Sequence, residues 1–266
     1  MGRNKCSLDS VEMYSTISQS WTHFAPMNEC RASATAHYYN EQIMITGGHD
    51  NWKLTNCVEA MFLRVTPKEW YPCPFEPPAL SWGHKPGIHR DCLWTVGGSI
   101  GGSSSKSISK VSLQPPYTMT LEAEMPQPLS YHGLEIIGDN LMIIGGSTTG
   151  YPQGAVDTVL SYNTVSKSFV ELPSLQFPMA DVTTVKVGDN ILIIGGTTRH
   201  NRSLNTVFKY NCKTKQCTQL PSMKYKRSEC AAVVCGHQVF VMGGNRILEG
   251  FHNSVECFDL LDQVWV

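Results

Sequence analysis

Short apolar runs, each followed by a pair of glycines, recur along the chain. The runs are IMIT from Ile43, LWTV from Leu93, LMII from Leu141, ILII from Ile191 and VFVM from Val239. Runs of this length that turn residues bound are too short for helices and are typical of strands buried on both faces. The pattern therefore predicts a set of equivalent buried strands.

The glycine pairs set the period of a repeat. They follow one another at spacings of 50, 48, 50 and 48 residues, and they are Gly47 and Gly48, Gly97 and Gly98, Gly145 and Gly146, Gly195 and Gly196, and Gly243 and Gly244. A turn signal such as GDN at 138–140 or 188–190 precedes each run, and a further short strand precedes the turn, which predicts a hairpin. Glycine at the end of the run allows a positive φ or a close approach of another backbone.

A polar loop and a further strand signal follow the glycine pairs, and several copies of that strand carry an aromatic residue. Another bulky residue stands seven positions later in three copies: Trp21 after Tyr14, Phe169 after Tyr162 and Trp265 after Phe258. Each repeat therefore contains four short predicted strands. We expect a set of aromatic residues to pack between neighbouring repeats: Tyr14, Trp21, Trp70, Tyr162, Phe169, Tyr210, Phe258 and Trp265.

A four-stranded antiparallel unit of this size cannot bury its apolar faces alone. Blades that stack around an axis solve the problem, with the apolar run of each repeat near the centre. The predicted fold class is thus all-β, a β-propeller of four-stranded antiparallel blades that forms one domain over residues 1–266.

The glycine pair after an apolar strand, the later aromatic and the tryptophan together resemble the kelch motif. The resemblance covers essentially residues 7–266, although the second copy replaces the aromatic and the tryptophan, with Val111 at the place of Tyr14. It implies a kelch β-propeller, similar to the six-bladed propellers of kelch-like proteins. Those propellers often follow a BTB domain and present substrates to a cullin ubiquitin ligase.

The predicted strand pairs do not add up to complete blades. Besides the five recognisable repeats, residues 11–24 belong to a sixth blade that is only partly present. We interpret the sequence as a fragment of a longer protein that forms an incomplete ring and shows no BTB domain. An unclosed ring leaves edge strands that invite pairing with other chains.

The variable loops predict the functional surface. In a meander of four strands, the loops after the glycine pairs and the leads into the first strands share one face, and binding residues concentrate on such loops. We expect the partner-binding residues to be Arg31, His49, Trp52, Tyr131, His132, Tyr151, Arg199, Arg202, Arg227, Arg246 and Phe251. Arg31 and Arg227 match a Met-x-x-x-Arg pattern that lines the peptide pocket in kelch-like propellers, so that role is implied by the resemblance.

The arginines of this face suggest an acidic or phosphorylated peptide as ligand, because a guanidinium binds carboxylates and phosphates in a two-pronged way. Solvated loop charges are the alternative interpretation, and the aromatic residues of the loops either anchor a partner or fold back on the scaffold. An actin-associated scaffold is the alternative to the ligase adaptor.

Charge and composition exclude other classes of partner. The 21 Lys and Arg balance 22 Asp and Glu for a net charge of -1, so no overall field attracts nucleic acid or an anionic membrane. No secretory signal or membrane-spanning run is recognisable, and we expect a cytoplasmic protein with reduced thiols. The spacings of Cys212 with Cys217 and of Cys230 with Cys235 do not favour zinc, and we expect neither a metal nor another cofactor.

An enzyme is the weaker alternative. His84 and His89 do not share a face in a way that favours metal binding or acid–base catalysis. The extra domain of galactose oxidase-type propellers and the Asp-box of sialidases are both missing from the sequence. We therefore predict a non-catalytic protein-interaction module.

Overall fold

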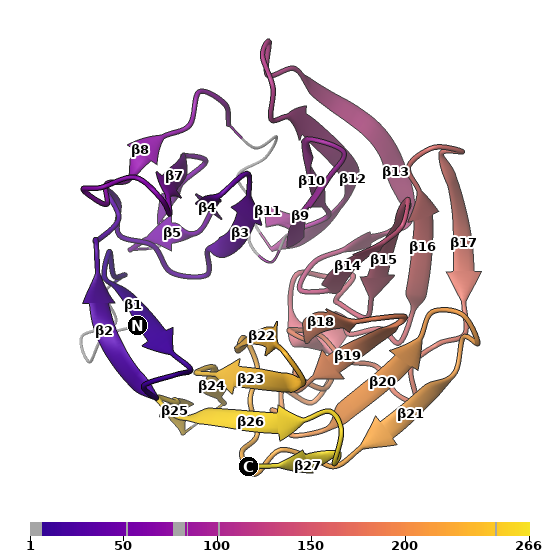
Figure 1. Cartoon of the computed structure of the whole chain (residues 1–266). Coiled ribbons are helices and arrows are strands. Elements are labelled where there is room, and N and C mark those ends of the chain that lie inside the picture. The colour runs from indigo at the N-terminus through magenta and orange to yellow at the C-terminus, as the bar shows by residue number, and fades with distance from the viewer. Residues whose placement is uncertain (1–6, 52, 77–82, 84, 101, 248) are drawn as a thin grey trace. The chain divides into compact units, whose positions relative to one another are not determined.

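The structure is a computed structural model that describes residues 7–51, 53–76, 83, 85–100, 102–247 and 249–266. These residues are almost entirely strands and loops, and the helical element among them is the short 3-10 helix η1 (Pro152–Gly154) (Figure 1). They form two compact units, the first within residues 1–82, 88–95 and 109–122 and the second within 83–87, 96–108 and 123–266. The single domain over residues 1–266 stays a prediction.

Within its described residues, the first unit contains one four-stranded antiparallel sheet and two strand pairs. The four-stranded sheet has the order β3-β4-β7-β8. Its strands are β3 (Thr35–Tyr39), β4 (Gln42–Thr46), β7 (Val58–Phe62) and β8 (Tyr71–Pro72). The pairs are β1 (Val11–Ser15) with β2 (Ser20–Phe24), and β5 (His49–Asp50) with β6 (Lys53–Leu54).

The second repeat forms a sheet whose residues are divided between the two units. Its order is β11-β12-β10-β9, and β13 pairs with β12. The strands are β9 (Lys85–His89), β10 (Cys92–Val96), β11 (Ser99–Ile100), β12 (Ser103–Ser112) and β13 (Met119–Leu129).

The second unit contains three further four-stranded antiparallel sheets within its described residues, in which each strand pairs with the next of its blade. The first is formed by β14 (Gly133–Ile137), β15 (Asn140–Ile144), β16 (Val159–Asn163) and β17 (Ser168–Leu172). The second is formed by β18 (Thr183–Val187), β19 (Asn190–Ile194), β20 (Val207–Asn211) and β21 (Cys217–Leu220). The third is formed by β22 (Ala231–Cys235), β23 (Gln238–Met242), β26 (Val255–Asp259) and β27 (Val264–Trp265), and β24 (Asn245–Arg246) pairs with β25 (Gly250–Phe251) in its loop.

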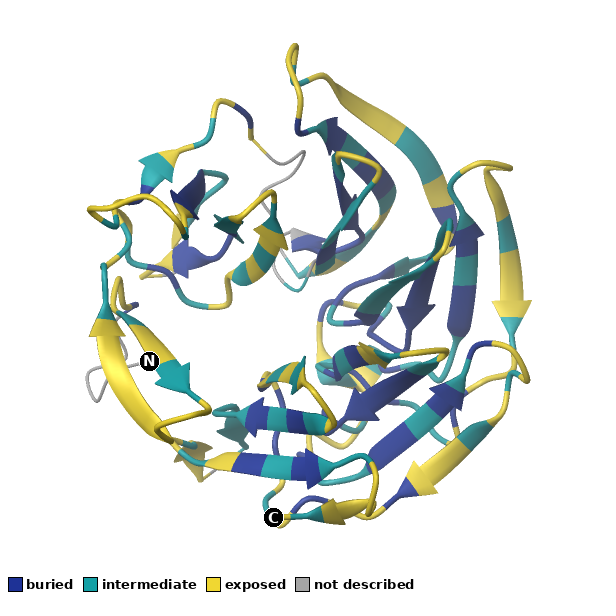
Figure 2. Ribbon diagram, viewed as in Figure 1, coloured by how far each residue is buried: buried dark blue, intermediate teal, exposed yellow. Residues whose placement is uncertain are grey.

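The apolar runs of the sequence are the second strands of the blades. Leu141 to Ile144 and Ile191 to Ile194 are all buried, as Figure 2 shows for β15 and β19. The outer strands β17 and β21, which lie at the edges of their sheets, are more exposed than these second strands. The prediction of an all-β fold of four-stranded antiparallel blades is confirmed.

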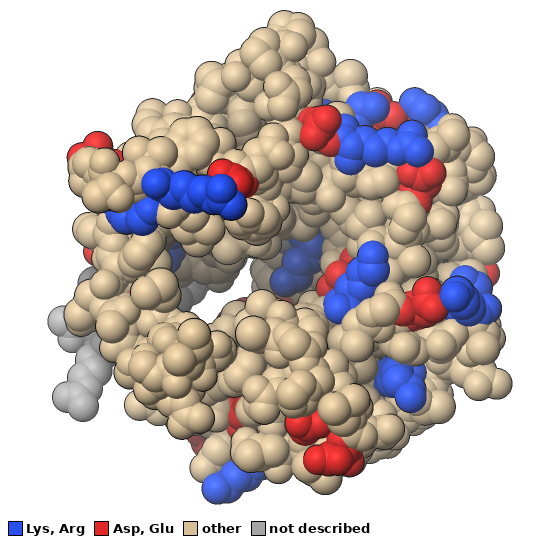
Figure 3. Space-filling view, in the orientation of Figure 1, with Lys and Arg blue, Asp and Glu red and all other residues tan. Residues whose placement is uncertain are grey.

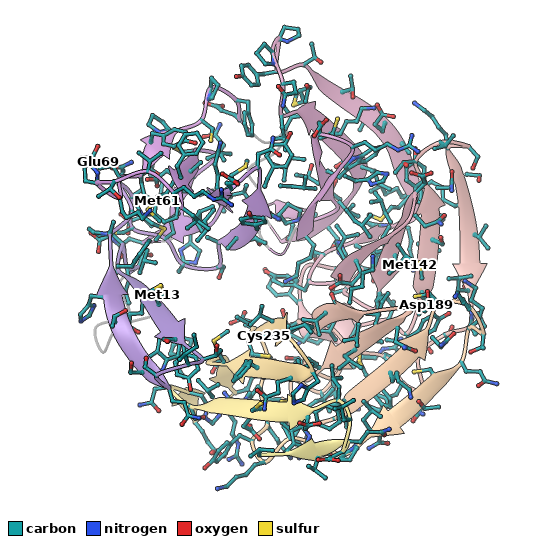
Figure 4. All side chains as sticks on the ribbon, in the orientation of Figure 1. Met13, Met61, Glu69, Met142, Asp189 and Cys235 are labelled. Carbon is teal, nitrogen blue, oxygen red and sulfur yellow. The ribbon has the colours of Figure 1, made fainter. Side chains whose placement is uncertain are left out.

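The core of the second unit lies between adjacent blades. Met142 of β15, labelled in Figure 4, packs in one cluster with Ile191 of β19 and with Phe208 and Tyr210 of β20. Phe258 of β26 lies in the next cluster with residues of β19 and β20. Stacking therefore buries the faces that a single blade leaves open.

The glycine pairs take positive φ in every copy, and Gly195 shows why the side chain must be absent. Its φ is +60°, and a Cβ atom there would lie 2.2 Å from the carbonyl oxygen of Arg227. Gly196 donates its N–H to the same oxygen at 2.8 Å. At this glycine pair, one blade is therefore hydrogen-bonded to the segment that leads into the first strand of the next blade.

The aromatic residues lie opposite their predicted partners. Tyr162 faces Phe169, and Phe258 faces Trp265, with ring centroids 4.8 and 5.0 Å apart. Cys217 faces Tyr210, the position that the sequence left without a second aromatic. The tyrosine rings of β16 and β20 are completely buried.

In the first unit the aromatic residues differ in burial. Trp70 is buried, and its indole N–H donates to the carbonyl of Ala25 at 2.9 Å. Tyr14 faces Trp21 at 5.1 Å, but Trp21 is 47% exposed and Tyr14 is only partly buried. The expectation that Trp21 is wedged between blades is therefore wrong, because β1 and β2 pair with each other and, among the described residues, with no further strand.

Across the described ranges, no helix has the length and apolar character needed to cross a bilayer.

Candidate functional site

Arg227 does not reach the surface, although the sequence placed it among the partner-binding residues. Its side chain is completely buried and pairs with Glu256 of β26, with 3.0 Å between Nη2 and Oε1. Nη1 donates to the carbonyls of Gly243 and Ser254 at 2.6 and 3.0 Å. Every branch of the guanidinium is therefore engaged inside its own blade.

Arg31 has the same environment in the first unit. Its side chain is completely buried, and Nη2 lies 2.8 Å from Oε1 of Glu59 on β7. Nη1 donates to the carbonyls of Gly47 and Cys57, each at 2.8 Å. The expectation that Arg31 and Arg227 line a peptide surface is wrong, since neither guanidinium is accessible to a partner.

The glutamates complete the arrangement by accepting backbone hydrogen bonds. Glu59 Oε2 accepts the N–H of Asn28 at 2.7 Å, and Glu256 Oε2 accepts the N–H of Lys224 at 2.6 Å. Each Met-x-x-x-Arg segment is thus tied to the third strand of its own blade. We call the pairs Arg31–Glu59 and Arg227–Glu256 the arginine staples.

The glutamates are the residues that sequence reasoning missed, although a signal was present. The blades that lack the arginine also lack the glutamate: Leu129 and Met179 replace the arginine, and Leu160 and Phe208 stand at the place of Glu59. All four of these apolar residues are buried. The joint presence of arginine and glutamate indicates a buried ion pair rather than a ligand site.

The loops of the second unit form a continuous surface. Isolated bridges join Ser130 with Ser147, Ala180 with Thr197 and Ser228 with Asn245, so the lead into each blade lies beside the loop after its glycine pair. We use the term loop surface for residues 147–157, 197–206, 245–247 and 249–254 with the leads into β14, β18 and β22.

Hydrogen bonds connect the loops of successive blades. Arg199 Nε donates to the carbonyl of Ala155 at 2.7 Å, and the N–H of Ile247 donates to Ser203 Oγ at 3.0 Å. Each loop is therefore supported by its neighbour, which holds the exposed side chains in a defined arrangement.

The predicted surface residues of these loops are exposed to different degrees. Arg199 and Arg202 are exposed, and so are Tyr151 and Phe251 at 59% and 54%. Arg246 is partly buried and pairs with Glu249, with 2.6 Å between Nη1 and Oε2. Arg199 and Arg202 are therefore the stronger candidates for binding an anionic group.

Tyr151 leans against the preceding repeat without being covered by it. A Cβ atom on Gly102 would lie 2.8 Å from the Tyr151 hydroxyl oxygen. The ring thus touches the scaffold at its hydroxyl end while most of its surface faces solvent, an arrangement that suits an apolar anchor.

The remaining predicted residues are less accessible. His49 and His132 are buried, so neither presents its ring to a partner, and burial lowers the pKa of His49. The expectation of surface histidines at these two positions is wrong, because His49 itself pairs with Ala32 and Leu54, and His132 lies two residues after Ser130, which pairs with Ser147. Trp52 lies outside the described residues.

A row of left-handed residues leads into the blades of the second unit. Tyr131, Asp181 and Glu229 have φ values of 55°, 53° and 53°. The N–H of Tyr131 donates to the carbonyl of Gly83 at 2.7 Å, Asp181 donates to Tyr131 at 2.8 Å, and Glu229 donates to Asp181 at 3.4 Å. This backbone chain lines up side chains from successive blades, and we call these three the lead residues.

Burial and mutual repulsion perturb the titration of the lead residues. Burial and the nearby Glu229 carboxylate raise the pKa of Asp181 to about 7, although Lys85 opposes the shift. Burial also raises the pKa of Glu229 and lowers that of Lys85. Burial raises the pKa of Tyr131 to about 12. The Tyr131 ring packs on Gly83, where a Cβ atom would lie 2.5 Å from it.

Asp181 is expected to make stability depend on pH. Its folded-state pKa lies above the unfolded value near 3.9, so folding retains a proton that the unfolded chain loses, and stability falls as the pH rises from about 4 to about 7. Asp181→Asn should raise the free energy of unfolding at pH 8 by about 1 to 2 kcal/mol, below the full conversion of the shift because the side chain is partly solvated.

Urea unfolding at a series of pH values measures this effect. Asp189→Asn, at a turn where the carboxylate pairs with exposed Lys213, is the control and should leave the slope between pH 4 and 7 unchanged. Parallel curves for the wild-type protein and Asp181→Asn would show that Asp181 ionises normally.

The face drawn in Figure 3 shows no large region of one charge among the described residues. Figure 3 shows basic and acidic side chains interspersed on the face that it draws. No group of three His, Cys, Asp or Glu side chains in the described ranges is placed to hold a metal ion. His84, named with His89 in the sequence, lies outside the described residues.

Comparison with known proteins supports the repeat that the glycine pairs and apolar runs predict. The family model of the kelch motif matches residues 178–224 and 226–266, which contain the blades β18–β21 and β22–β27. The chain is also similar to beta-scruin of Limulus polyphemus, with 26% identity over 198 residues that cover 70% of this chain and 21% of beta-scruin. The chain thus spans about a fifth of the length of that relative.

Proposed function

Because the chain is a kelch-repeat β-propeller protein, we propose that its loop surface binds an acidic or phosphorylated peptide segment of a protein partner. In this proposal it is a non-catalytic interaction module without a cofactor. It serves as the substrate receptor of a cullin-type ubiquitin ligase in the cytoplasm.

The observation that carries the proposal is the pair of exposed arginines on one ordered loop. The N–H of Thr198 donates to the carbonyl of Arg202 at 3.0 Å, and the N–H of Asn201 donates to Thr198 at 2.9 Å, so the loop between them is a closed turn. In the described part of the chain neither guanidinium has an ion-pair partner. Two guanidinium groups on a fixed loop suit carboxylate or phosphate oxygens.

Neighbouring side chains define how a peptide would lie. Tyr151 and Phe251 project from the loops on the two adjacent blades and offer apolar anchors on either side of the arginine loop. Asp181 and Glu229 carry carboxylates at the leads, which disfavours an acidic peptide residue there. The acidic part of a ligand is therefore expected over Arg199 and Arg202.

Charge reversal tests the peptide site. Acidic peptides that bind the wild-type protein are first selected from a degenerate library of short peptides that includes phosphoserine. Arg199→Glu with Arg202→Glu should weaken the binding of these peptides by at least about tenfold. Lys167→Glu with Lys213→Glu makes the same change in net charge at exposed turns of the same unit and should leave affinity unchanged. Equal losses in both variants, or none in the first, would argue against the loop surface as the site.

The ligase role has its own test. Immunoprecipitation of the full gene product should recover a cullin together with the bound partner. Recovery of a peptide-bearing partner without any cullin would leave the binding surface in place and end the adaptor hypothesis.

An actin-associated scaffold is the second candidate, and the similarity to beta-scruin favours it. Co-sedimentation of the purified chain with filamentous actin tests this role. Retention in the pellet that is abolished by Arg199→Glu with Arg202→Glu would support an actin-binding loop surface, and a protein that stays in the supernatant would exclude it.

A further inference from the structure

The three lead residues form one cluster of side chains in the second unit. They precede β14, β18 and β22 by two positions, and these first strands lie side by side, β14 against β18 and β18 against β22 (Figure 1). The charges of Asp181 and Glu229 both act on the Tyr131 hydroxyl, and that of Glu229 also acts on Asp181. Two carboxyl groups and one aromatic ring therefore converge from three blades.

The two carboxylates of the cluster have no ion-pair partner among the described residues. Asp181 is only partly buried and Glu229 is exposed, so a ligand can reach both. Lys85 of β9 is the basic side chain whose charge acts on each of them, and it is shared with a third carboxylate, that of Glu135 on β14. One ammonium group thus faces three carboxyl groups, and the cluster carries a net negative charge when all of them are ionised.

A buried hydroxyl group beside Asp181 also lacks a partner. Thr197 is completely buried, and its backbone pairs with Ala180, the residue before Asp181. Its Oγ1 lies close enough to the Asp181 carboxyl to favour the ionised form, yet among the described residues it completes no hydrogen bond of normal geometry. A buried hydroxyl without a partner costs free energy. A bound cation that holds Asp181 in the ionised form would give Thr197 the acceptor that it lacks.

The chemistry of the cluster suits a basic side chain. An ammonium or guanidinium group pairs with carboxylates and also binds to the face of an aromatic ring. Tyr131 offers such a ring beside Asp181 and Glu229, and it is partly exposed. The cluster therefore combines the two kinds of group that recognise a lysine or an arginine.

The cluster adjoins the loop surface. Tyr151, an exposed aromatic residue of that surface, interacts electrostatically with Tyr131. The pairing of Thr197 with the residue before Asp181 places this carboxyl beside the arginine loop of residues 198–202. A short peptide on the loop surface can therefore contact the arginine loop and the lead residues together.

We propose that the lead residues bind a lysine or arginine side chain of the same peptide whose acidic residues bind Arg199 and Arg202. This inference rests on the proposed function and adds a second determinant to it, a basic residue of the ligand that lies on Asp181 and Glu229. A purely acidic segment would leave these two carboxylates without a counter-charge. Specificity thus comes from charges of both signs in a fixed order along the partner segment.

Binding of the basic side chain should release a proton from Asp181. Burial and the Glu229 carboxylate raise the pKa of Asp181 to about 7, so this group is mostly protonated at pH 6 and mostly ionised at pH 8. The titratable groups on the elements packed around it are Lys85, Tyr131, Glu135, Glu229 and Cys230. The pKa values of both glutamates are raised as well, which acts in the same direction. Since a cation binds the ionised form, the affinity of a lysine-bearing peptide should rise by about tenfold from pH 6 to pH 8.

Peptides that differ by one lysine test the subsite. The parent is an acidic peptide that binds the wild-type protein and contains no lysine, arginine, histidine or phosphoserine. It is lengthened at either end by glycine spacers of increasing length followed by lysine, and a matched series carries glutamine in place of the lysine. Isothermal titration calorimetry at pH 8 should show at least one lysine peptide that binds about tenfold tighter than its glutamine counterpart, with a smaller gain at pH 6.

Amide variants assign this gain to the lead residues. Asp181→Asn with Glu229→Gln should abolish the gain without weakening the glutamine peptides. Asp189→Asn with Glu171→Gln makes the same change in charge at exposed positions of the same unit and should keep the gain. A lysine series that binds no tighter than the glutamine series, or a gain that survives Asp181→Asn with Glu229→Gln, would overturn the proposal and leave the acidic site on the arginine loop in place.

A separate measurement applies if no acidic peptide binds, in which case the proposed function itself fails. Carbon-13 NMR then follows the titration of the Asp181 carboxyl carbon, assigned with Asp181→Asn, in about 100 mM acetyl-lysine amide and in the same concentration of sodium chloride. A lower pKa of Asp181 in acetyl-lysine amide would support the basic subsite. An equal pKa in the two solutions would overturn it.

Discussion

Replacing Arg227 by alanine is expected to lower the free energy of unfolding by about 3 to 5 kcal/mol. The substitution removes the ion-pair partner of Glu256, whose side chain is only 9% exposed, and leaves the carbonyl of Gly243 without its side-chain donor. An uncompensated buried charge costs more than the net gain of the intact pair. Urea denaturation followed by intrinsic fluorescence measures the loss.

The neighbouring blade provides the matched control. Arg227→Met with Glu256→Phe copies the Met179 and Phe208 pair, which occupies the same two positions in a buried cluster. This double variant should recover most of the stability lost in Arg227→Ala, since an apolar pair of suitable volume replaces a buried ion pair at little cost. If Arg227→Ala alone has no effect, the staple does not hold the blade.

Gly195→Ala is expected to destabilise the fold by about 3 kcal/mol or more. The new Cβ atom would meet the Arg227 carbonyl oxygen at 2.2 Å, and the left-handed backbone adds strain of about 1 to 2 kcal/mol. The backbone oxygen cannot move away without breaking its hydrogen bond to Gly196. Thermal and urea unfolding both report the change.

Gly188→Ala separates the contact from the backbone strain. Gly188 has a φ of +58°, nearly the same as Gly195, but no atom lies within 4 Å of its added Cβ. This variant should lose only about 1 to 2 kcal/mol. Equal losses at the two positions would mean that glycine recurs for its φ alone and not for the contact between blades.

The strands and their order could be predicted because they depend on local signals. An apolar run, a turn and a glycine pair repeat at nearly constant spacing, and the steric demand seen at Gly195 recurs at Gly97 and Gly145. Opposed aromatic pairs such as Tyr162 and Phe169 follow from the short turn between two adjacent strands. Such features need no knowledge of distant parts of the chain.

The role of the arginines depended on a distant residue. Arg31 and Glu59 are 28 positions apart, and only the register between β4 and β7 brings them together. Read alone, an arginine in a predicted loop indicates a surface charge. The comparison of blades that carry both charges with blades that carry neither would have predicted the buried pair.

The lead residues were difficult to predict for another reason. Left-handed φ values are recognisable in sequence at glycine, as at Gly83, but the lead residues are a tyrosine, Tyr131, and two carboxylates, Asp181 and Glu229, with no glycine among them. Their alignment comes from backbone hydrogen bonds between blades, which leave no residue pattern. The raised pKa of Asp181 therefore could not be inferred without coordinates.

The distinction between buried and exposed arginines is the central claim, and peptide binding tests it most directly. The affinity of an acidic peptide selected on the wild-type protein should be measured for two folded variants, Arg227→Met with Glu256→Phe and Arg199→Glu with Arg202→Glu. We predict that the first variant keeps its affinity within about twofold and that the second loses at least about tenfold. The reverse result, with binding lost in the first variant and kept in the second, would contradict the assignment of the loop surface.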